Sequence, residues 1–312
     1  MAPPRPFRFG VQLTSAPDAA TWADQARKAE DLGYSTLFMP DHFGDQLSPV
    51  VALQAAADAT TTLRIGSLVY DNDFRHPVVL AKDAATLDIL SGGRLELGLG
   101  AGWMTTDYDR SGIPMEAPRV RVERMEEAVA VLKGCFGPEG FSYEGTHYRI
   151  SGYDGYPKPV QTPHPPLLIG GGRERVLSFA AREAQIIGVN PTIPNGRIDA
   201  DAARTGTAAA TDEKLAWIEA AAGDRFADLE LQALHFATII TDDRQGVIDM
   251  MAPLFGIAPD EVADFPHALI GTVEEIVADL EARRERWGFS YVVVQTEALE
   301  AFGPVVAALA GR

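Results

Sequence analysis

The chain has 312 residues, of which 46% are hydrophobic and 23% charged, a balance typical of a folded globular protein that excludes wholesale disorder. Its formal net charge of −17 repels phosphate backbones and anionic membrane surfaces, so we expect neither nucleic acid nor a membrane as a partner. A single cysteine, Cys135, excludes an intrachain disulfide, and the chain shows neither an apolar signal core nor a run of about 18 apolar residues. These features predict a cytoplasmic protein.

Strand-type and helix-type patterns alternate through the first half of the chain. The strands are short apolar runs, and the helices follow turn signals and keep one apolar face. The patterns predict strands at residues 7–14, 35–39, 63–70 and 94–99, with helices after Pro17 and at residues 49–60, 77–90 and 119–133.

The second half continues the alternation after an irregular stretch at residues 134–165, which includes a hairpin around Glu144. A second irregular stretch, residues 191–206, is the best candidate for a mobile lid. Thr272 and Glu275 predict a capping box, and Gly288 predicts the end of that helix. The remaining strands are predicted at residues 166–169, 185–190, 229–240 and 291–295, with helices from 173 to 183, up to 222, at 242–255 and at 299–309.

Eight strands alternating with helices predict an α/β fold, a parallel (β/α)8 TIM barrel with helices outside. We expect one domain, residues 1–312, with the irregular stretches near 134–165 and 191–206 as insertions. An open doubly wound sheet is the alternative. Against it, Trp103 stands where the third glycine of a dinucleotide-binding G-x-G-x-x-G would be.

Ligands of parallel barrels bind at the carboxyl ends of the strands, and four polar or glycine-rich clusters follow predicted strands here. Asp41 and His42 follow the second strand, residues 69–72 the third, Gly100, Ala101, Gly102 and Trp103 the fourth, and Gly170, Gly171, Gly172 and Arg173 the fifth.

The glycine triplet at the start of a helix has two interpretations. Bare backbone followed by a helix N-terminus offers N–H donors to a phosphate. Alternatively, the glycines serve only a tight turn that needs positive φ. On the triplet alone the two interpretations are equally good.

Adjacent Asp41 and His42 suit acid–base chemistry, because histidine titrates near neutral pH and a carboxylate can position a ligand. A capping or surface role is the alternative for such a pair. The chain has no H-E-x-x-H, no G-x-S-x-G and no Walker motif, so we predict no metal site, serine hydrolase or P-loop NTPase.

Taken together, six short motifs resemble the luciferase-like monooxygenases and their flavin- or deazaflavin-dependent barrel relatives. They occur in the family's order: FGVQL, PDH at 40–42, FRHP at 74–77, SGGRLELGLGAGW at 91–103, PLLIGGG at 166–172 and GTVEEIVADL at 271–280. The details of residues 71–94 look most like the branch that uses coenzyme F420. The resemblance implies a bacterial-luciferase-like barrel, a homodimer and a small organic substrate.

The resemblance also implies roles for the strand-end residues. A non-proline cis peptide would lie near Leu68 and Val69 behind the cofactor ring, which Asp41 would contact. His42 would be the catalytic proton donor or acceptor. The cofactor site would further include Gly100, Ala101, Gly102, Gly170, Gly171, Gly172 and Arg173, and the substrate pocket Phe43 and Trp103.

One position departs from the family pattern. Deazaflavin sugar-phosphate dehydrogenases of this family carry a glutamate where this chain has Trp103, which implies a more apolar substrate. The leading hypothesis is F420-dependent hydride transfer to or from an organic substrate. The alternatives are an FMNH2-dependent monooxygenase and a flavin- or deazaflavin-binding protein without turnover.

Overall fold

The computed structural model describes residues 5–312, which group into two compact units. One unit comprises residues 5–13, Lys28–Thr36 and Ile169–Arg312, and the other comprises Thr14–Arg27 and Leu37–Leu168. We call them the C-terminal unit and the N-terminal unit. The expectation of a single domain stays a prediction.

The N-terminal unit alternates strands and helices and adds a hairpin. Its elements, including three that are divided between the units (α1, β2 and β8), are α1 (Ala19–Asp31), β2 (Thr36–Met39), α2 (Pro49–Ala59), β3 (Arg64–Ser67), β4 (Tyr70–Asp71), η1 (Asn72–Phe74), α3 (Pro77–Leu90), β5 (Leu95–Gly100), α4 (Thr105–Ser111), α5 (Pro118–Phe136), β6 (Phe141–Glu144), β7 (Arg149–Tyr153) and β8 (Leu167–Gly171). Strands β3 and β4 both pair with β5 in parallel.

The C-terminal unit carries the remaining elements. They are β1 (Arg8–Gln12), α6 (Glu174–Glu183), β9 (Ile186–Val189), α7 (Ala200–Arg204), α8 (Ala208–Ala222), η2 (Gly223–Asp228), β10 (Glu230–Leu234), β11 (Ala237–Ile240), α9 (Arg244–Phe255), α10 (Pro259–Ala263), β12 (Ala268–Gly271), α11 (Val273–Trp287), β13 (Phe289–Gln295), η3 (Thr296–Ala298) and α12 (Gly303–Leu309). Strand β13 lies between β1 and β10, and β10 pairs with β9, all in parallel.

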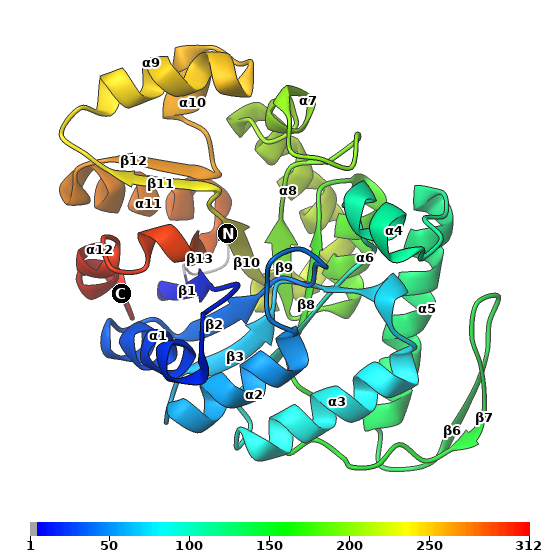
Figure 1. The fold of residues 1–312 in the computed structure, drawn as a ribbon. Helices are drawn as coiled ribbons and strands as arrows, with labels where there is room; N and C mark the ends of the chain where they lie inside the picture. The colour runs from blue at the N-terminus through cyan, green and yellow to red at the C-terminus, as the bar shows by residue number, and fades with distance from the viewer. Residues whose placement is uncertain (1–4) are drawn as a thin grey trace. The chain divides into compact units, whose positions relative to one another are not determined.

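Parallel strands that alternate with helices give the chain the architecture of a (β/α)8 barrel, as the sequence predicts (Figure 1). The eight strand positions are β1, β2, β3 with β4, β5, β8, β9, β10 and β13. No helix within residues 5–312 is both long and apolar enough to cross a membrane.

Local sequence signals explain several boundaries. Thr272 accepts a hydrogen bond from the Glu275 N–H at 3.3 Å, and Glu275 accepts one from the Thr272 N–H at 2.8 Å, which confirms the predicted capping box of α11. Gly288 ends that helix with φ +74, a left-handed conformation that glycine adopts without cost. The predicted hairpin is also present, as the antiparallel pair β6–β7.

Two predictions of element boundaries are wrong, and two elements, β12 and α4, were not predicted. The strand predicted at residues 229–240 ends at Leu234, and β11 instead pairs with the unpredicted β12 in a separate two-stranded sheet. Helices α9 and α10 lie on one side of this small sheet and α11 on the other (Figure 1). The stretch at residues 191–206 is not wholly irregular, because α7 forms within it, and α4 was not predicted at all.

Candidate functional site

His42 lies just after β2, and its ring is fixed by a carboxyl group from α4. Nδ1 of His42 lies 2.7 Å from Oδ2 of Asp107, and the other oxygen of Asp107 accepts the Phe43 N–H at 3.1 Å. Asp107 is buried while the His42 side chain is 24% exposed, so the carboxyl end of the pair is shielded from water and the ring remains accessible. With Asp107 as acceptor, Nδ1 keeps its proton and Nε2 is left as a proton acceptor. No group in residues 5–312 bonds to Nε2, so the ring can take up and return a proton there.

Aromatic rings border this histidine. The Trp103 ring meets the His42 ring edge-on, with centroids 5.5 Å apart and planes at 87°. Phe43 is 53% exposed, and its ring packs against that of Phe74, with the ring centroids 4.5 Å apart. The two residues predicted to line a substrate pocket therefore lie beside the predicted catalytic residue, and the Trp103 ring gives one side of His42 an apolar surface.

Asp41 is held by a bidentate ion pair. Its two carboxylate oxygens accept hydrogen bonds from Arg75 at 2.5 and 3.1 Å, and Oδ2 also accepts the Asp71 N–H at 3.0 Å. Asp41 is buried and Arg75 largely so, and such a pair is stable only with this complete set of partners. Asp41 thus ties the end of β2 to the residues that follow β4, and its predicted contact with a cofactor stays a prediction.

The peptide bond between Leu68 and Val69 is cis, as the family resemblance predicts. The Leu68 N–H donates to the carbonyl of Met39 at 2.8 Å, which fixes the bond beside the end of β2. The Val69 side chain packs against β5, where a Cβ on Gly100 would lie only 2.6 Å from Cγ2 of Val69. A glycine at position 100 is therefore required by this close contact.

A buried cluster of two carboxyls and one tyrosine lies beneath Gly102. The Tyr108 hydroxyl lies 2.9 Å from Asp71 Oδ2 and 3.1 Å from Asp73 Oδ2. Burial, followed by the neighbouring Asp73 and Asp41 carboxylates, raises the pKa of Asp71 to about 7. Gly102 has φ +75, and a Cβ there would lie 1.9 Å from the Tyr108 hydroxyl, so only glycine fits.

Arg121 of α5 holds the loop after β5 from the other side. Its guanidinium donates to the carbonyl oxygens of Ala101, at 3.0 Å, and of Gly102, while Nε donates to the Glu116 carbonyl at 3.0 Å. Gly100 ends β5, and the carbonyls of Ala101 and Gly102, which follow it, are both occupied by Arg121.

The remaining predicted residues lie in the C-terminal unit, at the junction of β8 and α6. Gly170 and Gly171 belong to the strand, and none of the three glycines has positive φ, so the tight-turn interpretation is wrong. Close packing explains two of them. A Cβ on Gly171 would lie 2.5 Å from Val176 Cγ1, and one on Gly172 would lie 2.6 Å from the carbonyl oxygen of Asn190.

The polarity of this junction suits an anion. The Gly171 carbonyl accepts the Asn190 N–H and the Gly172 carbonyl accepts the Thr192 hydroxyl, both at 2.9 Å. Within the described residues, the N–H groups of Gly172 and Arg173 have no such partner, and Arg173 is exposed. The backbone carbonyls at this junction are therefore hydrogen-bonded, while the N–H groups directly before the N-terminus of α6 are free to bind an anion.

Lys214 anchors the segment that was predicted to be a lid. Its ammonium donates to the carbonyls of Asn190 at 2.8 Å and Thr205 at 2.5 Å, at the two ends of that segment. Burial lowers the pKa of Lys214 to about 8. The segment is therefore tied at its base, and its role as a lid stays a prediction.

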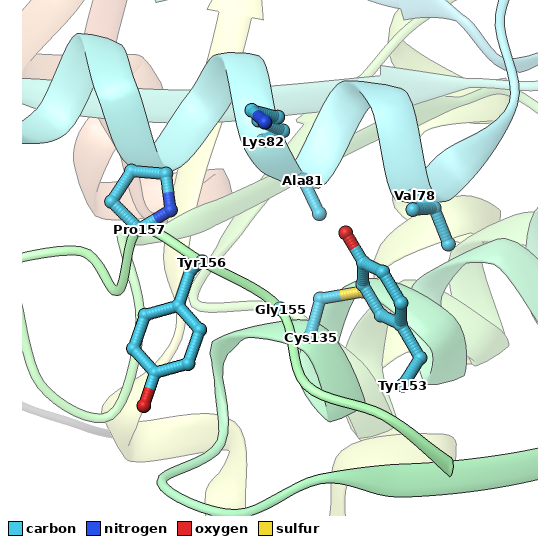
Figure 2. Close-up of a pocket in the computed structure, with 8 residues that line it drawn as sticks. All are labelled: Val78, Ala81, Lys82, Cys135, Tyr153, Gly155, Tyr156 and Pro157. Atoms are coloured by element: carbon cyan, nitrogen blue, oxygen red, sulfur yellow. The ribbon is translucent and has the colours of Figure 1, made fainter. Parts of the chain in front are cut away.

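A hollow in the N-terminal unit contains none of the predicted site residues. It lies between α3, Cys135 of α5 and residues 153–157, and Figure 2 shows these side chains. Burial raises the pKa of the Cys135 thiol to about 11, which makes it a poor nucleophile. Its residues pack the stretch after the hairpin against two helices, so we assign the hollow a packing role.

A model of the family described as luciferase-like monooxygenase matches residues 5–291. The chain belongs to this family. The match spans most of the chain and includes every residue of the geometry above.

Members of the family that resemble this chain use different cofactors. An F420-dependent glucose-6-phosphate dehydrogenase of Microbacterium testaceum is 30% identical over 189 residues, covering 58% of this chain and 55% of that protein. An FMNH2-dependent dimethylsulfone monooxygenase of Pseudomonas putida is 31% identical over 138 residues, covering 44% of this chain and 38% of that protein. The coenzyme F420-dependent tetrahydromethanopterin reductase of Methanopyrus kandleri aligns with a TM-score of 0.79 at 20% identity, covering 97% and 99% of the two chains, which shows the shared fold.

Sequence reasoning missed several residues of this luciferase-like site. Asp107 lies on a seven-residue helix that has no apolar period, and it meets His42 across 65 positions of sequence. Arg75 lies within the FRHP motif that carried the resemblance, but the motif did not show that its partner is Asp41. Arg121 and Tyr108 could have been noticed only as polar residues close to the glycines after β5.

Proposed function

We propose that the protein is an oxidoreductase that uses coenzyme F420 for hydride transfer to or from a small organic substrate. The observation that carries the proposal is the pair of His42 and Asp107, which leaves Nε2 of the ring free beside apolar side chains. The F420-dependent relative supports the choice of cofactor. When bound, the deazaflavin supplies a carbon centre that accepts or gives a hydride.

His42 handles the proton that accompanies the hydride. In the oxidative direction, Nε2 of His42 accepts the hydroxyl proton of an alcohol while the hydride leaves its carbon, and a carbonyl product forms. In the reductive direction the imidazolium returns the proton to the oxygen. Asp107 orients the ring in both directions and stabilises the imidazolium, because its carboxyl lies 2.7 Å from Nδ1.

The residues present fit a phosphate-bearing cofactor. The free N–H groups of Gly172 and Arg173 would hold its phosphate, since the neighbouring carbonyls are already occupied. Leu68 and Val69 would back its ring, and the Gly100–Gly102 loop would border it. The contacts within each unit support the role proposed for its own residues.

The substrate class follows from Trp103. An indole ring, instead of a charged group, lies edge-on to His42, and exposed Phe43 adds a second apolar surface. We propose an apolar secondary alcohol or ketone in place of a sugar phosphate, because a phosphate would find no cationic partner among these side chains.

Fluorescence titration with F420 beside FMN tests the cofactor. We expect F420 to bind and FMN to bind more weakly. A His42→Ala variant should retain F420 affinity and lose activity on secondary alcohols by about 10²-fold or more. His147→Ala is the matched control, because His147 lies at the β6–β7 hairpin. Tight FMN binding without F420 binding would refute the proposal.

A second candidate is an FMNH2-dependent monooxygenase, favoured by the dimethylsulfone monooxygenase relative. The same His42 would then serve oxygen chemistry. Oxygen consumption with reduced FMN distinguishes the two, because a deazaflavin reacts poorly with oxygen. Binding of either cofactor without turnover of any substrate would instead indicate a carrier.

A further inference from the structure

Gln232 is a fully buried residue of β10 whose side chain has no partner. It is 0% exposed, and neither Nε2 nor Oε1 forms a hydrogen bond with any described residue. An unsatisfied buried amide group costs about 1–3 kcal/mol, so proteins seldom keep one without a use. Leucine or methionine would fill the same place in the sheet without this cost.

Gly188 makes room for that amide. The register pairs Gln232 of β10 with Gly188 of β9. A Cβ on Gly188 would lie 3.0 Å from Oε1 of Gln232, closer than carbon normally approaches oxygen. Bare backbone at position 188 therefore lets the glutamine amide lie over the neighbouring strand.

A second amide reaches the same place from the end of β9. The Cβ position of Gly188 lies 3.5 Å from Nδ2 of Asn190 and 3.2 Å from the Cα of Gly170. Oδ1 of Asn190 is buried and has no partner among the described residues. Lys214 contacts Asn190 at the backbone oxygen, 2.8 Å away, and does not bond its side-chain oxygen.

The unpaired groups define the chemistry of a ligand. Two amide oxygens accept hydrogen bonds and one NH2 group donates them, while none of the three carries charge. Gly170 and Asn190, which border these amides, are only half-buried, unlike Gln232 itself. A charged ligand would lose its hydration here without gaining an opposite charge from these amides.

We propose that Gln232 and Asn190 form a subsite for a neutral group that carries N–H donors beside a carbonyl oxygen, such as a carboxamide, lactam or imide. The group can belong to the substrate or to the ring of a bound cofactor, and both sources share this chemistry. The proposal does not depend on hydride transfer, since it rests on the amides alone.

The test is a titration of the cofactor-free enzyme with benzamide, benzoate and toluene, followed by 15N NMR of glutamine side chains. The Gln232 signal is identified by its absence in Gln232→Met. We expect benzamide to shift that signal and to bind at least about tenfold more weakly to Gln232→Met. Gln245→Met is the matched control, because Gln245 is exposed on α9 and bonds Asp249.

Two further arms make the result decisive. The Asn190→Leu substitution should also weaken the binding of benzamide, which tests the subsite even if Gln232→Met does not fold. Displacement of benzamide by F420 assigns the subsite to the cofactor ring, and simultaneous binding assigns it to the substrate. Equal binding of benzamide and toluene, or a Gln232 signal that does not shift at saturation, overturns the proposal of this subsite. Neither result bears on the proposed function, which the F420 titration tests separately.

Discussion

Asp71→Asn replaces a buried carboxyl whose pKa is raised to about 7, against 3.8 in an unfolded chain. Between these values the folded protein binds more protons than the unfolded chain, so the free energy of unfolding falls as pH rises and levels off above pH 7. Within that window the free energy of unfolding falls by about 1.4 kcal/mol for each pH unit. From about pH 5.5 to about pH 8, ionisation of Asp71 should lower the free energy of unfolding of the native protein by about 2 kcal/mol. The Asp71→Asn variant should not show this decrease.

Urea unfolding followed by tryptophan fluorescence measures this difference across the pH range. Asp109→Asn is the control, because Asp109 lies on the same helix as Tyr108 and is exposed. The native protein and the control should lose stability in parallel as pH rises, while Asp71→Asn loses about 2 kcal/mol less. If all three curves are parallel, Asp71 is ionised in the folded protein at low pH, and the reasoning from its burial is wrong.

Three other outcomes are expected. Gly172→Ala places a Cβ 2.6 Å from a backbone oxygen and should lower the unfolding free energy by about 1–3 kcal/mol in thermal melts. Gly44→Ala, with nothing within 4 Å of its Cβ, should leave the melting temperature unchanged. Asp107→Asn should keep the affinity for F420, lower kcat by about tenfold or more and shift the pH–rate profile. An unchanged pH–rate profile would mean that Asp107 does not influence proton transfer by His42. Burial lowers the pKa of Lys214 from 10.5 to about 8, so stability should rise with pH across that window and the rise should vanish in Lys214→Met, as urea unfolding at each pH would show.

Local signals gave reliable predictions wherever the cause was local. The Thr272 and Glu275 capping box depends on residues three apart, and Gly288 needs only its own left-handed backbone. The alternation of strands and helices likewise reflects periodicity within each segment. These features fixed the number of barrel strands and the strand ends where Asp41 and His42 lie.

Long-range pairings were not predictable in the same way. The partner of His42 comes from a short helix with no amphipathic pattern, so nothing in the sequence near Asp107 indicates its use. Strand β11 continues the apolar run of β10, and only the presence of β12 as a partner separates the two. The glycine triplet shows a third case, since Gly172 is required by the main chain of Asn190, which lies 18 positions later in the printed sequence.

The interruption between β3 and β4 changes which face each later residue occupies. Ile65 pairs with Leu95 and Tyr70 pairs with Leu99, so five steps along one strand match four along the other. Tyr70 therefore points to the same side as Ile65, and Asp71 points to the side of Gly100, although an unbroken strand would reverse both. Deleting one residue between Ser67 and Tyr70 would remove the extra residue, so that four steps would match four and an unbroken strand would keep Tyr70 and Asp71 on their present sides. Inserting a further residue there would instead exchange the sides of the two residues.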